Sequence, residues 1–189
     1  MTVRIVPVPN DSDNPLLSPV FDQFRNAGLP VPILYRILGH APKMLEAWTS
    51  MAWNLRANAK TDRGLRELII MRVALLSREE YEWNAHWPAS IKFGVSQNQL
   101  KSLGDWKNSD CFSGEERIVL QCTDEITTEG GVSRKAFNQL AGKFSSESCI
   151  ELILTATFYS CVSRTLNSLG IKESESTQDC KETYHQNIS

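Results

Sequence analysis

Residues 65–86, LRELIIMRVALLSREEYEWNAH, decide how this chain folds. Residues 65–76 carry apolar side chains on most sides of a helix, which is typical of a helix buried at the centre of a domain. Ser77 then offers a favourable N-cap for a second helix, running to about residue 93. The stretch therefore predicts two consecutive helices, the first of them central.

Four of the ionisable side chains in this stretch are candidates for chemistry: Glu67, Glu79, Glu82 and His86. The last three are spaced at i, i+3 and i+7, so they lie along one stripe of the second helix, where Glu82 and His86 can touch. If this stripe faces a cavity, desolvation raises the pKa of its carboxyl groups, and the set becomes suited to proton transfer. We interpret it as a candidate acid–base site.

Two other interpretations of the stripe are open. It could be a solvated helix face whose i,i+4 ion pair contributes only tenths of a kcal/mol. It could also bind a divalent metal through Glu79, Glu82 and His86, but no second histidine lies nearby in the sequence, so we predict no metal site.

The remaining chain predicts an all-α protein of about eight helices, without a convincing strand series. Pro42 suits the first turn of a helix over about 42–57, with Trp53 near its end. Further helices are expected over 96–103, 114–128, 133–144 and 149–169. In the last of these, Ile150, Leu154, Phe158 and Cys161 are expected on a broad apolar face.

Three segments follow from these patterns. Residues 1–32 are rich in proline and predict an extended arm with one short helix at about 19–27. Residues 33–171 are predicted to form the helical domain. Residues 172–189 are polar with few apolar side chains and predict a disordered tail.

Composition narrows the possible functions. The chain has 189 residues, a net charge of -2 and scattered basic residues, so we expect no nucleic-acid partner. Its apolar runs are too short to span a bilayer, and its N-terminus lacks the apolar block of a signal peptide, so we expect a cytoplasmic protein without membrane contact. The five cysteines are irregularly spaced and form neither a disulfide framework nor a zinc motif.

The segment LRELIIMRVALLSREEYEWNAHWPASIKFGVSQNQL resembles the signature region of the carboxymuconolactone decarboxylase and alkylhydroperoxidase D-like superfamily. The similarity continues through FSGEERIVLQCTDEI and CIELILTATFYSCVSRTLNSLGI, so it covers roughly residues 33–171. This resemblance implies an alkylhydroperoxidase D-like all-α bundle that assembles as a homo-oligomer, either a dimer or a trimer.

The chain departs from the peroxidase members of that superfamily at the reactive positions. Those members carry Glu, Cys-x-x-Cys and His, at offsets that fall here on Glu67, Glu79, Glu82 and His86. Both cysteines are thus glutamates, in a YEWxxH form that resembles a branch without the cysteine pair. Because a carboxylate cannot cycle through a disulfide, a thiol peroxidase activity is not expected.

What the resemblance then implies is acid–base chemistry without a cofactor. We expect a decarboxylase, or an isomerase or cyclase, acting on an oxygenated cyclic carboxylic acid, lactone or polyketide-like molecule, with secondary metabolism as one expected setting. His86, Glu82 and Glu67 are the expected catalytic residues, and the expected substrate-binding residues are Glu79, Tyr81, Arg72 and Trp53. The alternative is a non-catalytic, oligomeric binding or scaffold member of the family.

Overall fold

The computed structural model describes residues 3–172 and 177–188, and every regular element in this part of the chain is helical. The elements, in chain order, are α1 (Ser18–Arg25), α2 (Ile33–Leu38), α3 (Pro42–Trp53), η1 (Asn54–Asn58), α4 (Arg63–Leu76), α5 (Glu80–Lys92), α6 (Gln97–Ser102), η2 (Leu103–Asn108), α7 (Gly114–Glu129), α8 (Arg134–Ala141), α9 (Ser146–Leu169) and α10 (Gln178–Ile188). Of these, η1 is a π-helical turn and η2 a 3-10 helix. The all-α prediction is confirmed, although the described residues form ten α-helices instead of eight.

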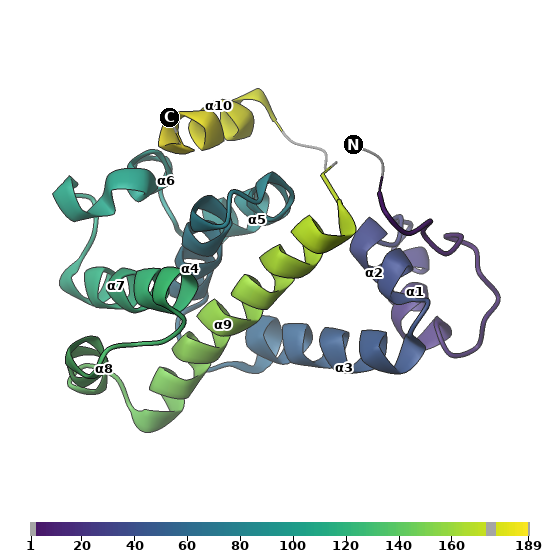
Figure 1. Cartoon of the computed structure of the whole chain (residues 1–189), viewed down its shortest axis with the longest axis horizontal. Helices are drawn as coiled ribbons and strands as arrows, with labels where there is room; N and C mark the ends of the chain where they lie inside the picture. The colour runs from purple at the N-terminus through teal and green to yellow at the C-terminus, as the bar shows by residue number, and fades with distance from the viewer. Residues whose placement is uncertain (1–2, 173–176, 189) are drawn as a thin grey trace.

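The central helix is α4, as its apolar pattern predicts. Eleven of its fourteen residues are buried, and it packs against α5, α7 and α9 (Figure 1). Asp62 caps its start, because the Asp62 carboxylate accepts a hydrogen bond of 2.9 Å from the backbone N–H of Leu65. Ile69 and Val73 belong to one hydrophobic core, whereas Leu68 belongs to a second one, so α4 joins the two.

The N-terminal residues are packed onto this bundle. The backbone N–H of Arg4 donates to the carbonyl of Leu169 at 3.0 Å, and that of Val8 donates to Arg36 at 3.1 Å. Helix α1 buries Phe21 completely in the first core. These contacts hold α1 and α2 beside α3, on the right-hand side of Figure 1.

The turn between α4 and α5 differs from the prediction that Ser77 caps the second helix. Arg78 has a φ of 49°, so the chain turns sharply there, and Ser77 becomes the C-cap of α4. Glu79 is the N-cap of α5, and its carboxylate accepts a hydrogen bond of 3.2 Å from the backbone N–H of Tyr81. The acidic stripe therefore starts at the very beginning of α5.

The buried face of α9 was also partly mispredicted. Ile150, Leu154 and Cys161 are exposed, with 58% of Ile150 accessible, whereas Leu152 and Tyr159 face the core. The reason is that α9 is apolar on most sides, so its sequence does not determine which side faces inward.

The prediction of a disordered tail is wrong for residues 178–188, which form α10; residues 173–176 and 189 lie outside the described part. Cys180 and Tyr184 are buried on one face of α10, and the indole N–H of Trp83 donates to the carbonyl of Cys180 at 3.1 Å. Only this narrow stripe of α10 is buried, so its sequence reads as polar throughout. Helix α10 thereby covers Trp83, the neighbour of Glu82.

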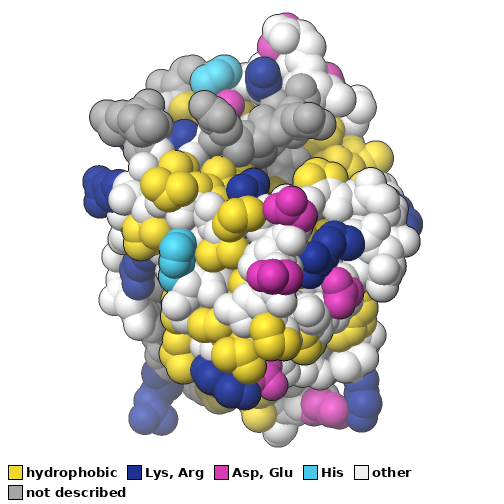
Figure 2. Space-filling model, turned by 90° about the vertical axis from the view of Figure 1, so that its right-hand side faces the viewer, with side chains coloured by type: hydrophobic (Ala, Val, Ile, Leu, Met, Phe, Trp, Pro, Cys, Tyr) yellow, Lys and Arg dark blue, Asp and Glu magenta, His cyan; other side chains and the backbone are white. Residues whose placement is uncertain are grey.

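The surface on the α1–α3 side mixes charges of both signs with hydrophobic side chains, and the described residues of this face form no large basic patch (Figure 2). In the described ranges, no helix combines the length and apolarity needed to cross a membrane.

Replacing Tyr184 with alanine tests whether α10 is part of the folded core. The Tyr184 ring lies 5.7 Å from the ring of Trp83, and its loss should lower the free energy of unfolding by about 3 kcal/mol. Urea denaturation measures the change. Gln186→Ala, at an exposed position of the same helix, is the control; equal effects of the two substitutions would contradict the packing of α10.

Candidate active site

An imidazole held between two carboxyl groups forms the centre of the site. The Nδ1 atom of His86 lies 2.7 Å from Oε2 of Glu67, and its Nε2 atom lies 3.4 Å from Oε2 of Glu82. Glu67 comes from α4, whereas Glu82 and His86 lie one turn apart on α5. All three side chains are buried. The packing of α4 on α5 therefore assembles a set that sequence spacing showed only in part.

Glu67 is the ionised member of this set. Burial alone would raise its pKa, but the electrostatic interactions and hydrogen bonds with His86 and Arg63 outweigh burial and hold the pKa below its ordinary value. Arg63 donates to the Oε1 atom of Glu67 from one helical turn earlier on α4. A carboxylate on Nδ1 fixes the orientation of the imidazole and leaves Nε2 facing Glu82.

Glu82 has the opposite electrostatic character. Its burial raises its pKa, and the neighbouring His86 and Arg56 offset that rise only partly. Its Oε2 atom is buried and has no hydrogen-bond partner among the described residues. One imidazole thus contacts a charged carboxylate and a carboxyl group that favours its protonated form, which is the arrangement expected of paired acid and base groups.

These groups face a cavity of about 290 Å³. Apolar side chains from α1, α3 and α9 form much of its wall, among them Phe24, Trp48 and Phe158. Its polar lining residues are Tyr35, Arg56, Arg63, Tyr81, Glu82 and His86. Burial raises the pKa of Tyr81 to about 12, so its hydroxyl stays protonated and can donate a hydrogen bond. The cavity can therefore hold a small molecule with its apolar part against aromatic rings and its reacting part against His86.

Two residues near His86 were not predicted from the sequence: Arg56, which lines the cavity, and Tyr159, whose ring contacts the imidazole. The Nε atom of Arg56 donates a hydrogen bond of 3.0 Å to the Tyr159 hydroxyl, and the Tyr159 ring contacts the ring of His86 edge-on at 5.1 Å. Arg56 lies in the π-helical turn η1, a geometry that often occurs at functional sites. No sequence signal connects Tyr159 to His86, because they lie on different helices far apart in the chain.

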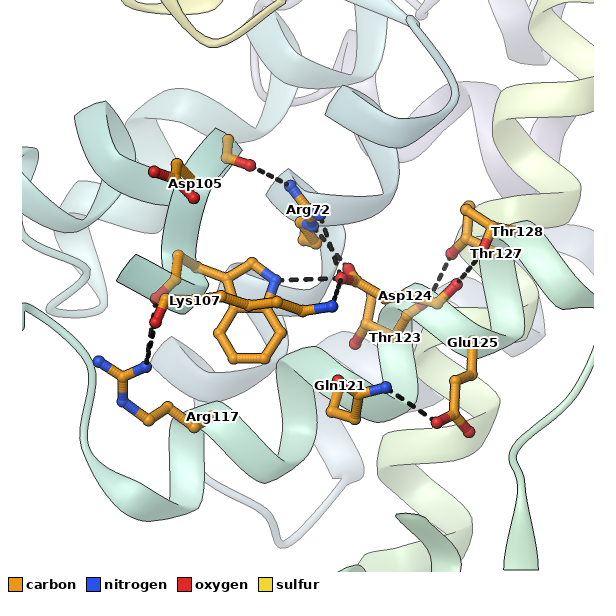
Figure 3. Close-up of polar contacts among 12 residues, drawn as sticks. Arg72, Asp105, Lys107, Arg117, Gln121, Thr123, Asp124, Glu125, Thr127 and Thr128 are labelled. Atoms are coloured by element: carbon orange, nitrogen blue, oxygen red, sulfur yellow. Dashed lines mark hydrogen bonds and ion pairs between the residues drawn. The ribbon is translucent and has the colours of Figure 1, made fainter. Parts of the chain in front are cut away.

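Arg72 lies away from the cavity, contrary to its predicted role in substrate binding. Its guanidinium group donates to both carboxylate oxygens of Asp124, at 2.7 and 3.1 Å, and to the carbonyl of Leu103 at 2.8 Å (Figure 3). Trp106 also donates to Asp124. All the nitrogens of Arg72 are therefore engaged in joining α4 to α7 and η2.

Glu79 and Trp53 also lie outside the lining of the His86 cavity. The Glu79 carboxylate caps α5, and Trp53 is 60% exposed at the end of α3, where it lines a second cavity. Glu79 therefore does not join Glu82 and His86 as a third ligand. In residues 3–172 and 177–188, no group of three His, Cys, Asp or Glu is placed to hold a metal ion.

Residues 42–125 match the carboxymuconolactone decarboxylase family. The matched segment is less than half of the chain, but it contains Glu67, Glu79, Glu82 and His86. A search of curated protein sequences finds no match.

Solved structures share the fold of the whole chain. A cysteine-to-alanine variant of the debrominase Bmp8, in complex with 2,3,4-tribromopyrrole, superposes with a TM-score of 0.78 at 20% identity, covering 99% of this chain and 98% of its own. A peroxidase-related protein with an alkylhydroperoxidase D core, from Ralstonia eutropha JMP134, gives a TM-score of 0.71 at 17% identity, with coverages of 96% and 92%. A peroxidase-related protein from Silicibacter sp. TM1040 gives 0.72 at 16% identity, with coverages of 87% and 88%. The predicted alkylhydroperoxidase D-like fold is confirmed.

Replacing Glu79 with glutamine tests its structural role. Burial raises the pKa of Glu79 from 4.5 to about 7, so between these pH values the folded protein binds more protons than the unfolded chain. Stability should therefore fall as pH rises through this interval, and Glu79→Gln should make that fall smaller. Urea denaturation at several pH values measures it.

Glu80→Gln is the matched control, because it removes a carboxylate at the next, partly exposed position. Identical pH profiles for the wild type and Glu79→Gln would contradict the raised pKa.

Proposed function

We propose that this protein is a cofactor-independent acid–base enzyme that acts on an oxygenated cyclic carboxylic acid, lactone or polyketide-like small molecule. One observation carries the proposal: His86 lies between an ionised Glu67 and a carboxyl group, Glu82, that favours its protonated form, at the wall of a cavity. The family match over residues 42–125 supports placing the chain in the carboxymuconolactone decarboxylase superfamily. We also propose that the chain belongs to the branch with the YEWxxH form, which lacks the cysteine pair.

The proposed reaction moves protons between the substrate and the pair formed by Glu82 and His86. Glu82 delivers its proton to a substrate carbon, while Nε2 of His86 accepts a proton from another substrate position or returns one to Glu82. The ionised Glu67 stabilises the imidazolium that forms on His86, through the bond to Nδ1. In isomerisation or cyclisation the two transfers balance. In decarboxylation, the C–C bond to the carboxylate breaks and CO₂ leaves. The electron pair of that bond takes up the proton of Glu82, and water then reprotonates Glu82.

Thiol redox chemistry is disfavoured at this site. None of the residues that line the cavity is a cysteine. Cys122, Cys149 and Cys180 are buried elsewhere, and burial raises the pKa of each thiol, which makes the reactive thiolate less available. The debromination named for the Bmp8 structure is therefore not proposed for this chain.

Replacing His86 with alanine tests the catalytic role. A panel of cyclic keto acids, lactones and enolisable polyketide-like ketones is incubated with protein in D₂O, and ¹H NMR follows both conversion and deuterium uptake at carbon. Turnover by His86→Ala should be lower by about tenfold or more, with an unchanged helical circular dichroism spectrum.

His40→Ala is the control, since the side chain of this exposed histidine makes one hydrogen bond among the described residues, with the carbonyl of Val6. Full activity of His86→Ala would refute the assignment. Binding of panel members without turnover by the wild type would favour the alternative function, a non-catalytic binding or scaffold protein.

We also propose that the chain forms a homo-oligomer, a dimer or a trimer. Ile150, Leu154 and Cys161 leave an apolar stripe on the exposed side of α9, and Met44 is 63% exposed on α3. Exposed apolar stripes of this kind are typical of subunit contacts.

Light scattering coupled to size-exclusion chromatography should give a mass of two or three chains. The double substitution Ile150→Glu and Leu154→Glu should shift that mass to one chain, because it puts charges into the contact. Arg134→Glu and Lys135→Glu, on the exposed start of α8, form the control pair. A wild-type mass of one chain would rule out the oligomer.

A further inference from the structure

A second cavity adjoins the one that contains His86. Its volume is about 400 Å³, and its wall includes Val20 and Trp53. The two cavities share a boundary, because four residues line both of them: Phe24, Tyr35, Ala52 and Arg56. We call the cavity at His86 the inner cavity and the one at Trp53 the outer cavity.

Arg56 is the only charged side chain common to the two cavities. Among the described residues, its Nε atom is bound to the Tyr159 hydroxyl, and no hydrogen bond or ion pair is made by its two terminal nitrogens. Burial opposes the charge on Arg56, but Tyr159, Tyr35 and Glu82 together hold its pKa above the ordinary value. A guanidinium group with two uncommitted nitrogens is thus fixed at the boundary of the cavities.

The charges around Arg56 show what it can bind. Arg63, the other arginine of the inner cavity, is paired with the ionised Glu67. An ionised Glu82 would attract Arg56, but burial makes the Glu82 carboxyl group favour its protonated form. In the described part of the chain, no ion pair within 4 Å joins Glu82 to Arg56. One positive charge is therefore left without a counter-charge in contact, which matches one negative charge on a ligand. Two guanidinium nitrogens match the two oxygens of a carboxylate in a bidentate pair.

We propose that Arg56 is the carboxylate anchor of the substrate, and that the apolar part of the substrate extends into the outer cavity against Trp53. This inference rests on the proposed function and specifies its substrate class: an apolar, ring-containing monocarboxylic acid. The carboxylate held by Arg56 is retained during the reaction, because a cation on a departing carboxylate would stabilise the starting state and oppose loss of CO₂. For such a substrate, the proposed reaction is therefore isomerisation or cyclisation, and decarboxylation is excluded. Tyr159 is a positioning residue, since it holds Arg56 through its hydroxyl and contacts His86 through its ring.

The experiment compares 1-naphthoate with 1-naphthamide, which has the same rings without the charge, by isothermal titration calorimetry. The wild type should bind the naphthoate about tenfold more tightly or better, as a charge-assisted bidentate bond allows. Arg56→Met should abolish that difference, whereas Arg56→Lys should retain part of it. Arg134→Met, which removes the same charge at an exposed position on α8, should change nothing.

A second comparison locates the apolar part of the ligand. Trp53→Ala should weaken binding of 1-naphthoate more than binding of benzoate, because only the larger ring system reaches the outer cavity. Trp53 is largely exposed, so this substitution leaves the core intact. Equal affinity of the wild type for naphthoate and naphthamide, or no binding of either, would refute the proposal that Arg56 anchors a carboxylate. This outcome can be measured on the wild-type protein alone.

The binding test is independent of turnover and can be repeated with His86→Ala. Naphthoate binding through Arg56 by a protein without activity would refute the proposed function alone. Activity that depends on His86, in a protein that does not distinguish naphthoate from naphthamide, would refute the anchor alone.

Discussion

The contact between His86 and Glu67 is the interaction on which the rest of the site depends. A carboxylate with no exposed surface is stable in a folded protein only if its charge is compensated, because desolvation costs several kcal/mol. Glu67 meets this requirement with Arg63 on its own helix and His86 on the next. The pair fixes how α5 lies on α4, and it also fixes which imidazole nitrogen faces the cavity. Fold and chemistry are thus set by the same hydrogen bond.

The distribution of charge follows from this pair. Since Arg63 and Glu67 compensate each other, the charge state of the inner cavity depends on Glu82, His86 and Arg56. Glu82 is buried beside a carboxylate that is already ionised, so a second negative charge is disfavoured there. A pair of cysteines at positions 79 and 82 could exchange electrons through a disulfide, whereas two glutamates can exchange only protons. The residues present on this helix pair are therefore suited to proton transfer.

Elements at both ends of the chain support this centre. The N-terminal segment contributes Phe24 and Pro32 to the cavity wall, so it is part of the binding site. Helix α10 covers Trp83 of α5, which does not line the cavity. Helix α5 therefore has packing partners besides α4 and the cavity wall. Arg72, by contrast, stabilises the bundle through Asp124 and takes no part in the site.

The sequence by itself determined the helical class, the central position of α4 and the pairing of Glu82 with His86 as a candidate site. These follow from local patterns, namely all-round apolarity in one helix and an i,i+4 spacing in the next, whereas Glu67 was assigned to the site by the resemblance to the superfamily. Only the tertiary structure decided the rest, because packing between helices depends on which of several apolar faces turns inward. As a result of this packing, Tyr159 and not Ile150 lies in the core, and Arg56 lines the same cavity as His86. Outside the lining of that cavity lie Arg72, Glu79 and Trp53. The packing also holds α10 by a stripe of a few residues, too narrow to distinguish a docked helix from a polar tail.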